Sequence, residues 1–415
     1  MIVDGRTILA DMDVLIARQP VFDARDKLVG YALTHSAQGA AVAHGLAEGV
    51  SAGRLMVEAL LGVGLDTLVD EQRLFLSVDA DLLQSDAIAL LPAARTTLLV
   101  SAVEIAGTPG VVSACERLLW AGYKVALVDV DEHLATHPIA RLADAVVLDV
   151  RAHDPASLAA LVAALRPLYV RLLASNVRHR AERDHCLRLG FELFFGHRSS
   201  RPERVVRKDV AIEHMQAFRL LRLARDTATT DVALEAMLKR DVTLSYKLLR
   251  MVNSADLGLR EVWSIGHALR LLGRVTLTRW LSLLLLTDIV PDDDRGTELS
   301  RVATMRARLC ELLAAESGVP RAGESLYLVG LLSLVDEMLE IPPEQVVQLL
   351  QLAPDVRDAL LHRADFYGEM LAMVEAYEVG DWATVETLGP RVGVAPHRLG
   401  ELYVEALQWA NAQRR

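Results

Sequence analysis

The spacing of apolar residues changes near residue 204. Before that point, short apolar runs of strand length alternate with stretches of helical periodicity. Repeated strand–helix units predict a parallel sheet covered by helices. Eight strands suit a closed barrel of the TIM type, and a doubly wound open sheet is the alternative. The predicted strands are 14–18, 28–33, 74–78, 98–103, 125–130, 145–148, 168–173 and 191–195, and the predicted helices are 40–69, 80–90, 111–120, 134–143, 157–165 and 178–189.

After that point, apolar residues recur with a helical period to the end of the chain. We therefore expect a leader over 1–13, an α/β barrel over 14–204 and an all-helical domain over 205–415. The broadest apolar helical face lies in 238–284, which predicts the middle of the helical domain. Asp241 or Thr243 is expected to cap one helix there, Ser264 to cap the next, and Gly273 to end it.

Composition limits the kinds of partner. The 415 residues carry a net charge of −11, which opposes broad attraction to DNA, RNA or anionic membranes. The longest apolar run, 280–286, is too short to span a bilayer, and the charged start of the chain does not resemble a signal peptide. Three scattered cysteines fit a reducing compartment. These features predict a cytoplasmic protein with no membrane and no DNA partner.

Motifs in the helical half carry a family resemblance. They are Asp241-Val-Thr-Leu244-Ser, Leu248-Leu-Arg-Met-Val-Asn253-Ser254-Ala255, Trp263-Ser264-Ile, Ala268-Leu-Arg-Leu-Leu-Gly273 and Tyr327-Leu-Val-Gly330-Leu-Leu-Ser-Leu-Val-Asp336. Together they resemble the HDOD domain, a modified relative of the HD-GYP and other HD phosphohydrolases. That resemblance implies an all-helical fold and assigns these residues to structure or interaction.

The first half resembles an EAL domain, the barrel that hydrolyses cyclic di-GMP. The resemblance covers about 14–204, which is shorter than a complete EAL domain. Its joining to an HDOD domain is a recognised architecture of signal transduction proteins. The segments that carry it are Ala17-Arg-Gln-Pro-Val-Phe-Asp23, Leu28-Val-Gly-Tyr31, Ala121-Gly-Tyr-Lys-Val-Ala-Leu-Val-Asp129, Leu189-Gly-Phe-Glu-Leu-Phe-Phe-Gly196 and Arg201-Pro202.

The EAL resemblance implies a two-metal site at the ends of the strands. Asp129 and Glu104 remain as carboxylates, and Arg178 stands at a further changed position. Two carboxylates cannot hold a pair of Mg²⁺ ions, because Mg²⁺ needs several oxygen ligands in strict geometry. We therefore expect no hydrolysis, no metal and no other cofactor. The positions at which the family's metal-binding and catalytic residues are replaced are Ala32, Ser77, Ser101, Val128, Val147, Ser175 and Phe195.

The helical half lacks the corresponding phosphohydrolase residues. Ser333 and Leu334 stand where the resemblance places the His-Asp pair. His214, His267 and His362 are far apart in the sequence. No phosphatase or nuclease site can be assembled from them.

Other patterns have weaker implications. His133 and His137 have a spacing that zinc sites use, although two surface histidines are the simpler interpretation. The basic stretch 166–208 could face an anionic partner, and a solvated helix with ion pairs at the domain boundary is favoured. Asn253 is expected to fix a turn. Trp263 and Trp280 are expected in the core.

The favoured function is a non-catalytic signalling scaffold that binds protein partners, with self-association as a further expectation. The first alternative is a cyclic di-GMP receptor that does not hydrolyse the nucleotide, although the replaced residues also argue against binding. The second is a residual phosphodiesterase. A nucleic-acid regulator ranks last because of the negative net charge.

Overall fold

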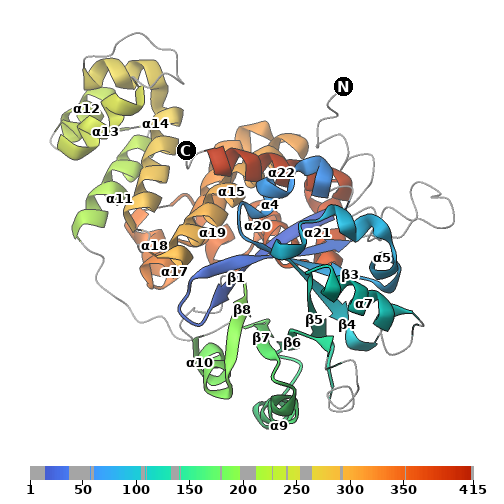
Figure 1. Ribbon diagram of the computed structural model, residues 1–415. Coiled ribbons are helices and arrows are strands. Elements are labelled where there is room, and N and C mark those ends of the chain that lie inside the picture. Colours follow the sequence, from blue (N-terminus) through green and yellow to red (C-terminus); the bar gives the residue numbers. More distant parts are fainter. Residues whose placement is uncertain are drawn as a thin grey trace.

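The computed structural model describes residues 15–36, 57, 60–103, 108, 110–131, 140, 142–177, 180–196, 212–226, 228–239, 242–252, 264–289, 293–350 and 352–412. Its strands close into a barrel in chain order, which confirms the barrel over the open sheet (Figure 1). β1 runs antiparallel to β2 and β8, and the remaining neighbours are parallel. The strands are β1 (Leu15–Asp23), β2 (Leu28–Ser36), β3 (Arg73–Val78), β4 (Thr96–Ser101), β5 (Lys124–Val128), β6 (Ala145–Asp149), β7 (Arg171–Ser175) and β8 (Phe191–Phe195).

Helices cover the barrel on the outside (Figure 1). In the order of the chain they are α4 (Leu65–Val69), α5 (Ala80–Gln84), α7 (Val111–Trp120), α9 (Pro155–Leu165) and α10 (Arg180–Leu189). Their starts follow local chemistry, as α9 shows. The Asp154 carboxylate accepts the N–H groups of Ala156 and Ser157 at 2.9 and 3.0 Å, and Pro155 occupies the first turn.

The second half is helical in every described segment. Its first part holds α11 (Ile212–Arg225), α12 (Asp231–Leu238), α13 (Val242–Val252) and α14 (Ile265–Ile289). Its second part holds α15 (Asp294–Glu316), α16 (Gly323–Leu332), α17 (Val335–Leu339), α18 (Pro343–Leu350), α19 (Pro354–His362), α20 (Asp365–Val379), α21 (Trp382–Val392) and α22 (Pro396–Ala412).

Several element boundaries differ from the sequence prediction. β1 continues beyond its predicted end at residue 18 to Asp23, because Pro20 needs no N–H partner and its carbonyl oxygen accepts the Gly196 N–H at 2.8 Å. β7 starts at Arg171 rather than at residue 168, since a 3₁₀ turn and Tyr169, with φ of 55°, end the preceding helix. The predicted helix 80–90 is α5 followed by a 3₁₀ turn, Asp86–Leu90.

Other predictions fall where the structure does not describe the chain. The leader 1–13 and the boundary at 204 and 205 lie outside the described residues. Most of the predicted helices 40–69 and 134–143 also lies outside the described residues. The end of the first predicted helix is observed as α4.

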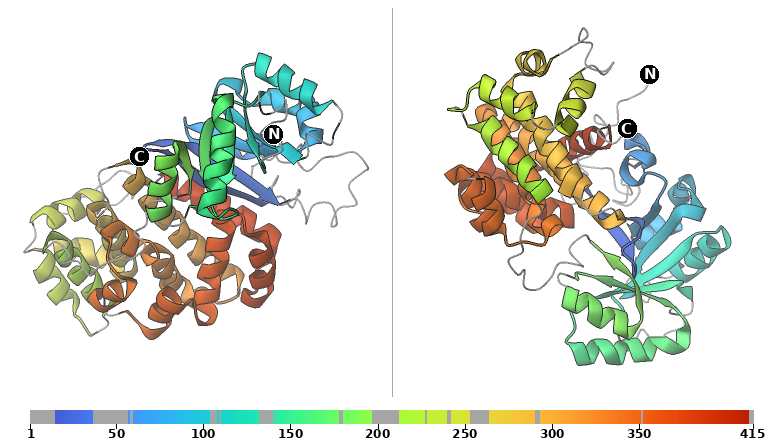
Figure 2. Two further views of the ribbon diagram at one scale, coloured as in Figure 1. Left: turned by 90° about the horizontal axis from the view of Figure 1, so that it is seen from below. Right: turned by 90° about the vertical axis from the view of Figure 1, so that its left-hand side faces the viewer.

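The expected centre of the helical domain is instead its far end. α12, α13 and the start of α14 lie farthest from the barrel in all three views (Figures 1 and 2). Leu244, Leu248 and Val252 are buried among the helices of this end, whereas Tyr246 is exposed. The apolar face of this segment is therefore covered by the neighbouring helices, while another side of α13 is open to solvent.

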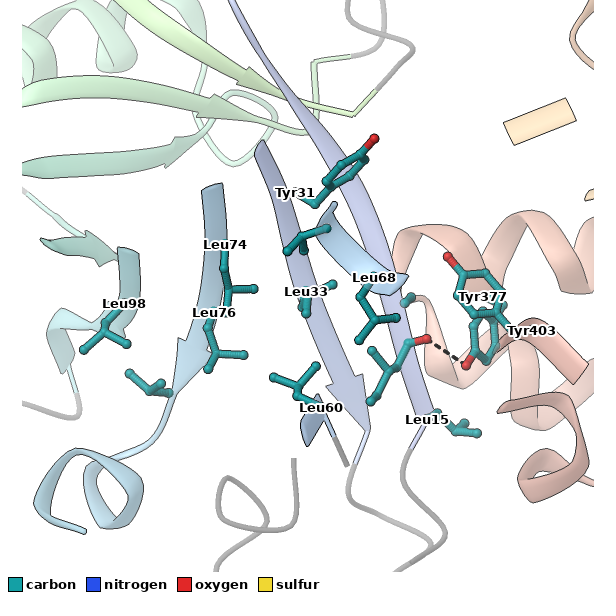
Figure 3. Packing of buried hydrophobic residues seen from close by; sticks show 14 of the residues in the cluster. Leu15, Tyr31, Leu33, Leu60, Leu68, Leu74, Leu76, Leu98, Tyr377 and Tyr403 are labelled. Atoms are coloured by element: carbon teal, nitrogen blue, oxygen red, sulfur yellow. Dashed lines mark hydrogen bonds between the residues drawn. The ribbon is translucent and has the colours of Figure 1, made fainter. Parts of the chain in front are cut away.

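One apolar core joins the two halves. A single cluster of buried residues runs from β2, β3 and β4 through β1 to α15, α20 and α22. β1 contacts both α20 and α22, so this strand belongs to the barrel and to the helical half (Figure 3). An interface that is apolar and continuous with the core fixes the two halves against each other. No helix among the described residues has the length and apolar character needed to cross a bilayer.

Candidate functional site at the barrel mouth

The interior of the barrel is filled by apolar side chains. Alternate residues of each strand point inward, and their layers pack as in other closed barrels. Phe75 and Phe195 meet edge to face near the centre, with 5.8 Å between ring centroids. The buried members of this cluster are Val21, Ala32, Phe75, Leu99, Ala126, Ala145, Val147, Leu173, Leu193 and Phe195.

The structure places the seven replaced positions on the inner wall and at its mouth. Ala32, Val147 and Phe195 are buried in the interior cluster, and Val128 packs against it. The three serines are half-buried, and the Ser175 hydroxyl donates to the Leu148 carbonyl at 3.4 Å. Ser77 and Ser101 stand at neighbouring strands, β3 and β4. None of the seven side chains carries a charge, so they do not fit a pair of Mg²⁺ ions.

Asp129 follows β5 and is exposed, with φ of 56°. The left-handed backbone there turns the chain sharply at the end of the strand. Glu104, the second retained carboxylate, lies outside the described residues, as do Arg178 and the pair His133 and His137.

A cavity of about 390 Å³ lies between the barrel mouth and the helical half. The ends of β7 and β8 and part of β1 form one wall, with Gln19, Asn176 and Phe195. The opposite wall comes from α15, α20, α21 and α22. The charged side chains of the lining are one arginine against four carboxylates, namely Arg18, Glu298, Glu375, Glu378 and Asp381.

Beside this cavity, four buried or half-buried polar side chains link β1 and β2 to α15. The Arg301 guanidinium donates to the Tyr31 hydroxyl at 2.8 Å, and that hydroxyl donates to a Glu298 carboxylate oxygen at 2.8 Å. Arg18 reaches the other Glu298 oxygen at 3.4 Å and lies 4.4 Å above the centre of the Tyr31 ring. Arg301 also pairs with Asp70 at 2.8 Å.

Burial dominates the electrostatics of this network. It raises the pKa of the Tyr31 hydroxyl, and the Glu298 carboxylate raises it further, so the hydroxyl remains a donor. Burial by itself lowers the pKa of the Arg18 guanidinium, but Glu298, Tyr31, Tyr403 and Asp70 together raise it more, and the net shift is upward. Arg18 therefore stays charged, and its contacts with those of Arg301 bind the helical half to the barrel.

Two tyrosines of the helical half complete this junction. The Tyr377 hydroxyl donates to the Ile16 carbonyl of β1 at 2.9 Å, and the Tyr403 ring lies 4.8 Å from the Tyr377 ring (Figure 3). No part of this junction was predicted from the sequence. The only sequence signal was a charged residue, Arg18, within an apolar strand.

A second buried charge cluster stands where the resemblance places the His-Asp pair. Arg306 of α15 is fully buried and donates to both Glu378 oxygens, through Nε at 3.0 Å. It also donates to Glu375 at 3.3 Å and to the Ser333 hydroxyl at 2.7 Å. Burial lowers the pKa of this guanidinium, but the charges and hydrogen bonds of Glu378 and Glu375 together raise it more, so the net shift is upward. An internal cation thus occupies this part of the helical fold.

The remaining motif residues of the helical half have structural roles where they are described. The Ser264 hydroxyl accepts the His267 N–H at 3.1 Å, which confirms the predicted cap. Gly273, with φ of 69°, makes a kink within α14, which continues beyond the predicted end to Ile289. Gly330 lets α16 approach α15, because an added Cβ would lie 2.6 Å from the Arg306 carbonyl oxygen. Asp336 is buried in the first turn of α17.

Other predicted residues have mixed outcomes. Asp241 and 253–255 lie outside the described residues, as does Trp263, whereas Trp280 packs against the core. In the basic stretch, Arg171 pairs with Glu192 at 2.8 Å and Arg183 pairs with Asp26 at 3.0 Å. These two cations are therefore satisfied within the protein, Arg183 in a buried position. The three separated histidines, His214, His267 and His362, lie in three different helices, α11, α14 and α19.

The comparisons with known proteins agree with this architecture. Residues 214–365 match the family model of the HDOD domain. The chain contains an HDOD domain. It follows an eight-stranded closed barrel, so the predicted order of a barrel and an HDOD domain is confirmed.

Two relatives match nearly the whole chain. The uncharacterized protein YuxH of Bacillus subtilis is 28% identical over 412 residues, covering 96% of this chain and 98% of its own. Cyclic di-GMP phosphodiesterase CdgJ of Vibrio cholerae is 28% identical over 400 residues, covering 95% of this chain and 92% of its own. In both, the barrel and the HDOD domain are matched together.

Solved structures match part of the chain. The PaMucR phosphodiesterase in complex with cyclic di-GMP has a TM-score of 0.36 at 20% identity, covering 46% of this chain and 96% of its own. The YkuI protein of Bacillus subtilis, which has an EAL domain and is in complex with cyclic di-GMP and calcium, has a TM-score of 0.35 at 16% identity, covering 58% and 75%.

Proposed function

We propose that this protein acts in cyclic di-GMP signalling as a non-catalytic scaffold that works through protein–protein contacts. The whole-length relationship to cyclic di-GMP phosphodiesterase CdgJ supports the signalling context. The observation that supports the non-catalytic role is the kind of side chain found at the barrel mouth. Four of its seven family positions hold apolar side chains packed in the interior, and three hold serines.

The physical reason is the ligand requirement of two-metal hydrolysis. Each Mg²⁺ ion takes near-octahedral oxygen coordination, and the pair has to hold both the attacking and the leaving oxygen. In the described part of the chain, Asp129 is the retained carboxylate at this mouth. The cavity between the barrel mouth and the helical half is lined by four carboxylates and one arginine. This negative charge disfavours the binding of a nucleotide that carries two negative charges.

Exposed apolar side chains in the HDOD domain support a protein-binding role. Val232, Tyr246, Leu271 and Val275 are exposed on α12, α13 and α14, at the end far from the barrel. We refer to these four residues as the distal apolar residues. Because the barrel is fixed to the helical half by a continuous core, the two halves present these residues as one body.

A phosphodiesterase is the second candidate, because the relative from Vibrio cholerae bears that name. Asp129 and Glu104 are the carboxylates that would take part. A receptor that binds cyclic di-GMP without cleaving it is the third candidate, with the cavity at the barrel mouth as its site.

Hydrolysis and calorimetry on the full chain separate these three. Cyclic di-GMP is incubated with the protein in Mg²⁺ or Mn²⁺, and products are resolved by chromatography. We expect no turnover and no binding at micromolar nucleotide. Turnover that disappears in Asp129→Ala but persists in the neighbouring control Asp131→Ala would establish the phosphodiesterase. Binding without turnover would establish the receptor.

The scaffold role has its own test. Partners captured on the full chain should be lost from Tyr246→Glu, which places a charge among the distal apolar residues. They should be retained by Trp120→Glu, which changes a more exposed aromatic side chain on the barrel. Equal capture by both variants would remove the HDOD end as the binding surface.

A further inference from the structure

A second cavity, of about 300 Å³, lies within the HDOD domain between α11, α14 and α16. It shares no lining residue with the acidic cavity at the barrel mouth. Its volume is at the lower end of the range for small-molecule sites. The lining residues are Ala224, Arg225, Arg274, Val275, Thr278, Arg279, Ser282, Glu324, Ser325, Tyr327 and Leu328.

The charge of this cavity is opposite to that of the whole protein. Three arginines, Arg225, Arg274 and Arg279, line it against one carboxylate, that of the exposed Glu324. The chain as a whole carries −11. Three guanidinium groups in one small cavity repel one another unless anions balance them, so their grouping needs an explanation.

Neighbouring carboxylates account for part of that charge. Arg274 is tied to the α12 side, where it pairs with Asp231 at 2.9 Å and donates to the Asp226 carbonyl at 2.8 Å. Arg279 pairs with Glu311, but Glu311 also pairs with Arg308 at 2.8 Å. One carboxylate is thus shared between two cations.

Arg225 has no counterion among the described residues. It lies in the last turn of α11 and is half-buried, and no hydrogen bond or ion pair to another described residue is present. Burial lowers the pKa of its guanidinium, and no carboxylate offsets that effect. A partly buried arginine without a partner destabilises the folded chain. Its presence here therefore points to a partner that is not part of the chain.

The side of the cavity formed by Arg279 and Tyr327 has more hydrogen-bond donors than acceptors. The Arg279 guanidinium lies 5.4 Å from the centre of the Tyr327 ring. Arg279 Nε and the Tyr327 hydroxyl are both buried, and neither has a hydrogen-bond partner among the described residues. Burial also raises the pKa of Tyr327, so its hydroxyl stays protonated. This wall therefore offers cations and donors, and few groups that accept.

We propose that this cavity binds a small ligand through a phosphate group, with Arg225 and Arg279 as its principal contacts. A phosphate brings two negative charges and several acceptor oxygens, and guanidinium groups bind it through paired hydrogen bonds. The ligand is of the size of a mononucleotide or a sugar phosphate. Bound there, it joins α11 and α14 to α16, which packs on α15 beside the barrel.

Isothermal titration calorimetry on the full chain tests this site. The probes are inorganic phosphate, pyrophosphate, 5′-GMP and glucose 6-phosphate, with guanosine as the uncharged control. We expect at least one phosphate probe to bind and guanosine not to bind. Arg225→Gln and Arg279→Gln should each weaken that binding at least about tenfold, since charged hydrogen bonds are lost.

The matched control is Arg219→Gln, which removes an exposed arginine of α11 that does not line the cavity. It should leave binding unchanged. Thermal unfolding without ligand gives a second readout, because removing an unpaired cation should leave the melting temperature of Arg225→Gln equal or higher. No binding at millimolar probe, equal weakening in the control, or a marked fall in that melting temperature would overturn the proposal. Because Arg225 and Arg279 belong neither to the barrel mouth nor to the distal apolar residues, either result leaves the proposed scaffold role to its own tests.

Discussion

The buried cation of the HDOD domain gives the sharpest quantitative prediction. Arg306→Met keeps a side chain of similar length and removes the guanidinium that contacts Glu378 through two hydrogen bonds. Glu375 keeps Arg363 as a partner at 2.9 Å, whereas Glu378 is left buried without its counterion. Breaking a buried pair from one side costs about 3–5 kcal/mol of unfolding free energy.

The double variant Arg306→Met, Glu378→Leu distinguishes a broken pair from a lost contact. Replacing both members by apolar side chains should recover most of the loss, because a buried ion pair and an apolar pair are of similar net value. Urea denaturation measures both. Arg357→Met, which removes a solvent-exposed ion pair with Asp358, is the control and should leave the urea midpoint nearly unchanged. A double variant as unstable as the single one would refute the reasoning.

Two further predictions concern packing and the buried thiols. Gly330→Ala places a Cβ 2.6 Å from a backbone oxygen of α15, so α16 must shift, and urea denaturation should show a loss of about 1–3 kcal/mol in unfolding free energy. The control is Gly323→Ala in the same helix, where the nearest atom to the added Cβ is 3.7 Å away, and it should show no loss. Equal effects of the two substitutions would contradict the packing argument. Burial raises the pKa of two thiols to about 11 and of the third to about 12, so a thiol reagent should label none of them in the folded protein at pH 8 and all of them in urea. Because the unfolded thiols ionise near pH 9, the stability that these groups contribute is present below that pH and is lost as pH rises toward 11 and 12, which unfolding curves across that range would test. The thiols are those of Cys115, Cys186 and Cys310.

Local pattern was enough for most of the barrel. The strand at residues 191–195 was predicted at its observed bounds, and the strand over 74–78 lies within β3. It failed at the end of the first strand. The strand predicted over 14–18 stopped before Pro20, but β1 continues to Asp23, because the missing N–H of Pro20 costs nothing where its carbonyl oxygen and its neighbours make the needed contacts.

The candidate site divides in the same way. Which side chains stand at the seven barrel positions could be predicted by resemblance, because it depends on residue identity alone. That Phe195 meets Phe75 inside the barrel could not, because the contact joins the last strand to the third. The arginine-lined cavity was also missed, since Arg225 and Arg279 lie 54 positions apart and only helix packing brings them together.

The sequence by itself determined the alternation of strands and helices, the change to an all-helical second half, and the absence of charged side chains at seven barrel positions. These follow from short-range periodicity and from side-chain chemistry. The tertiary structure alone decided that β1 is shared by both halves, that Arg306 is buried against Glu378, and that three arginines line one cavity of the helical half. Such contacts join residues distant in the chain, and their energies depend on burial, which no local pattern encodes.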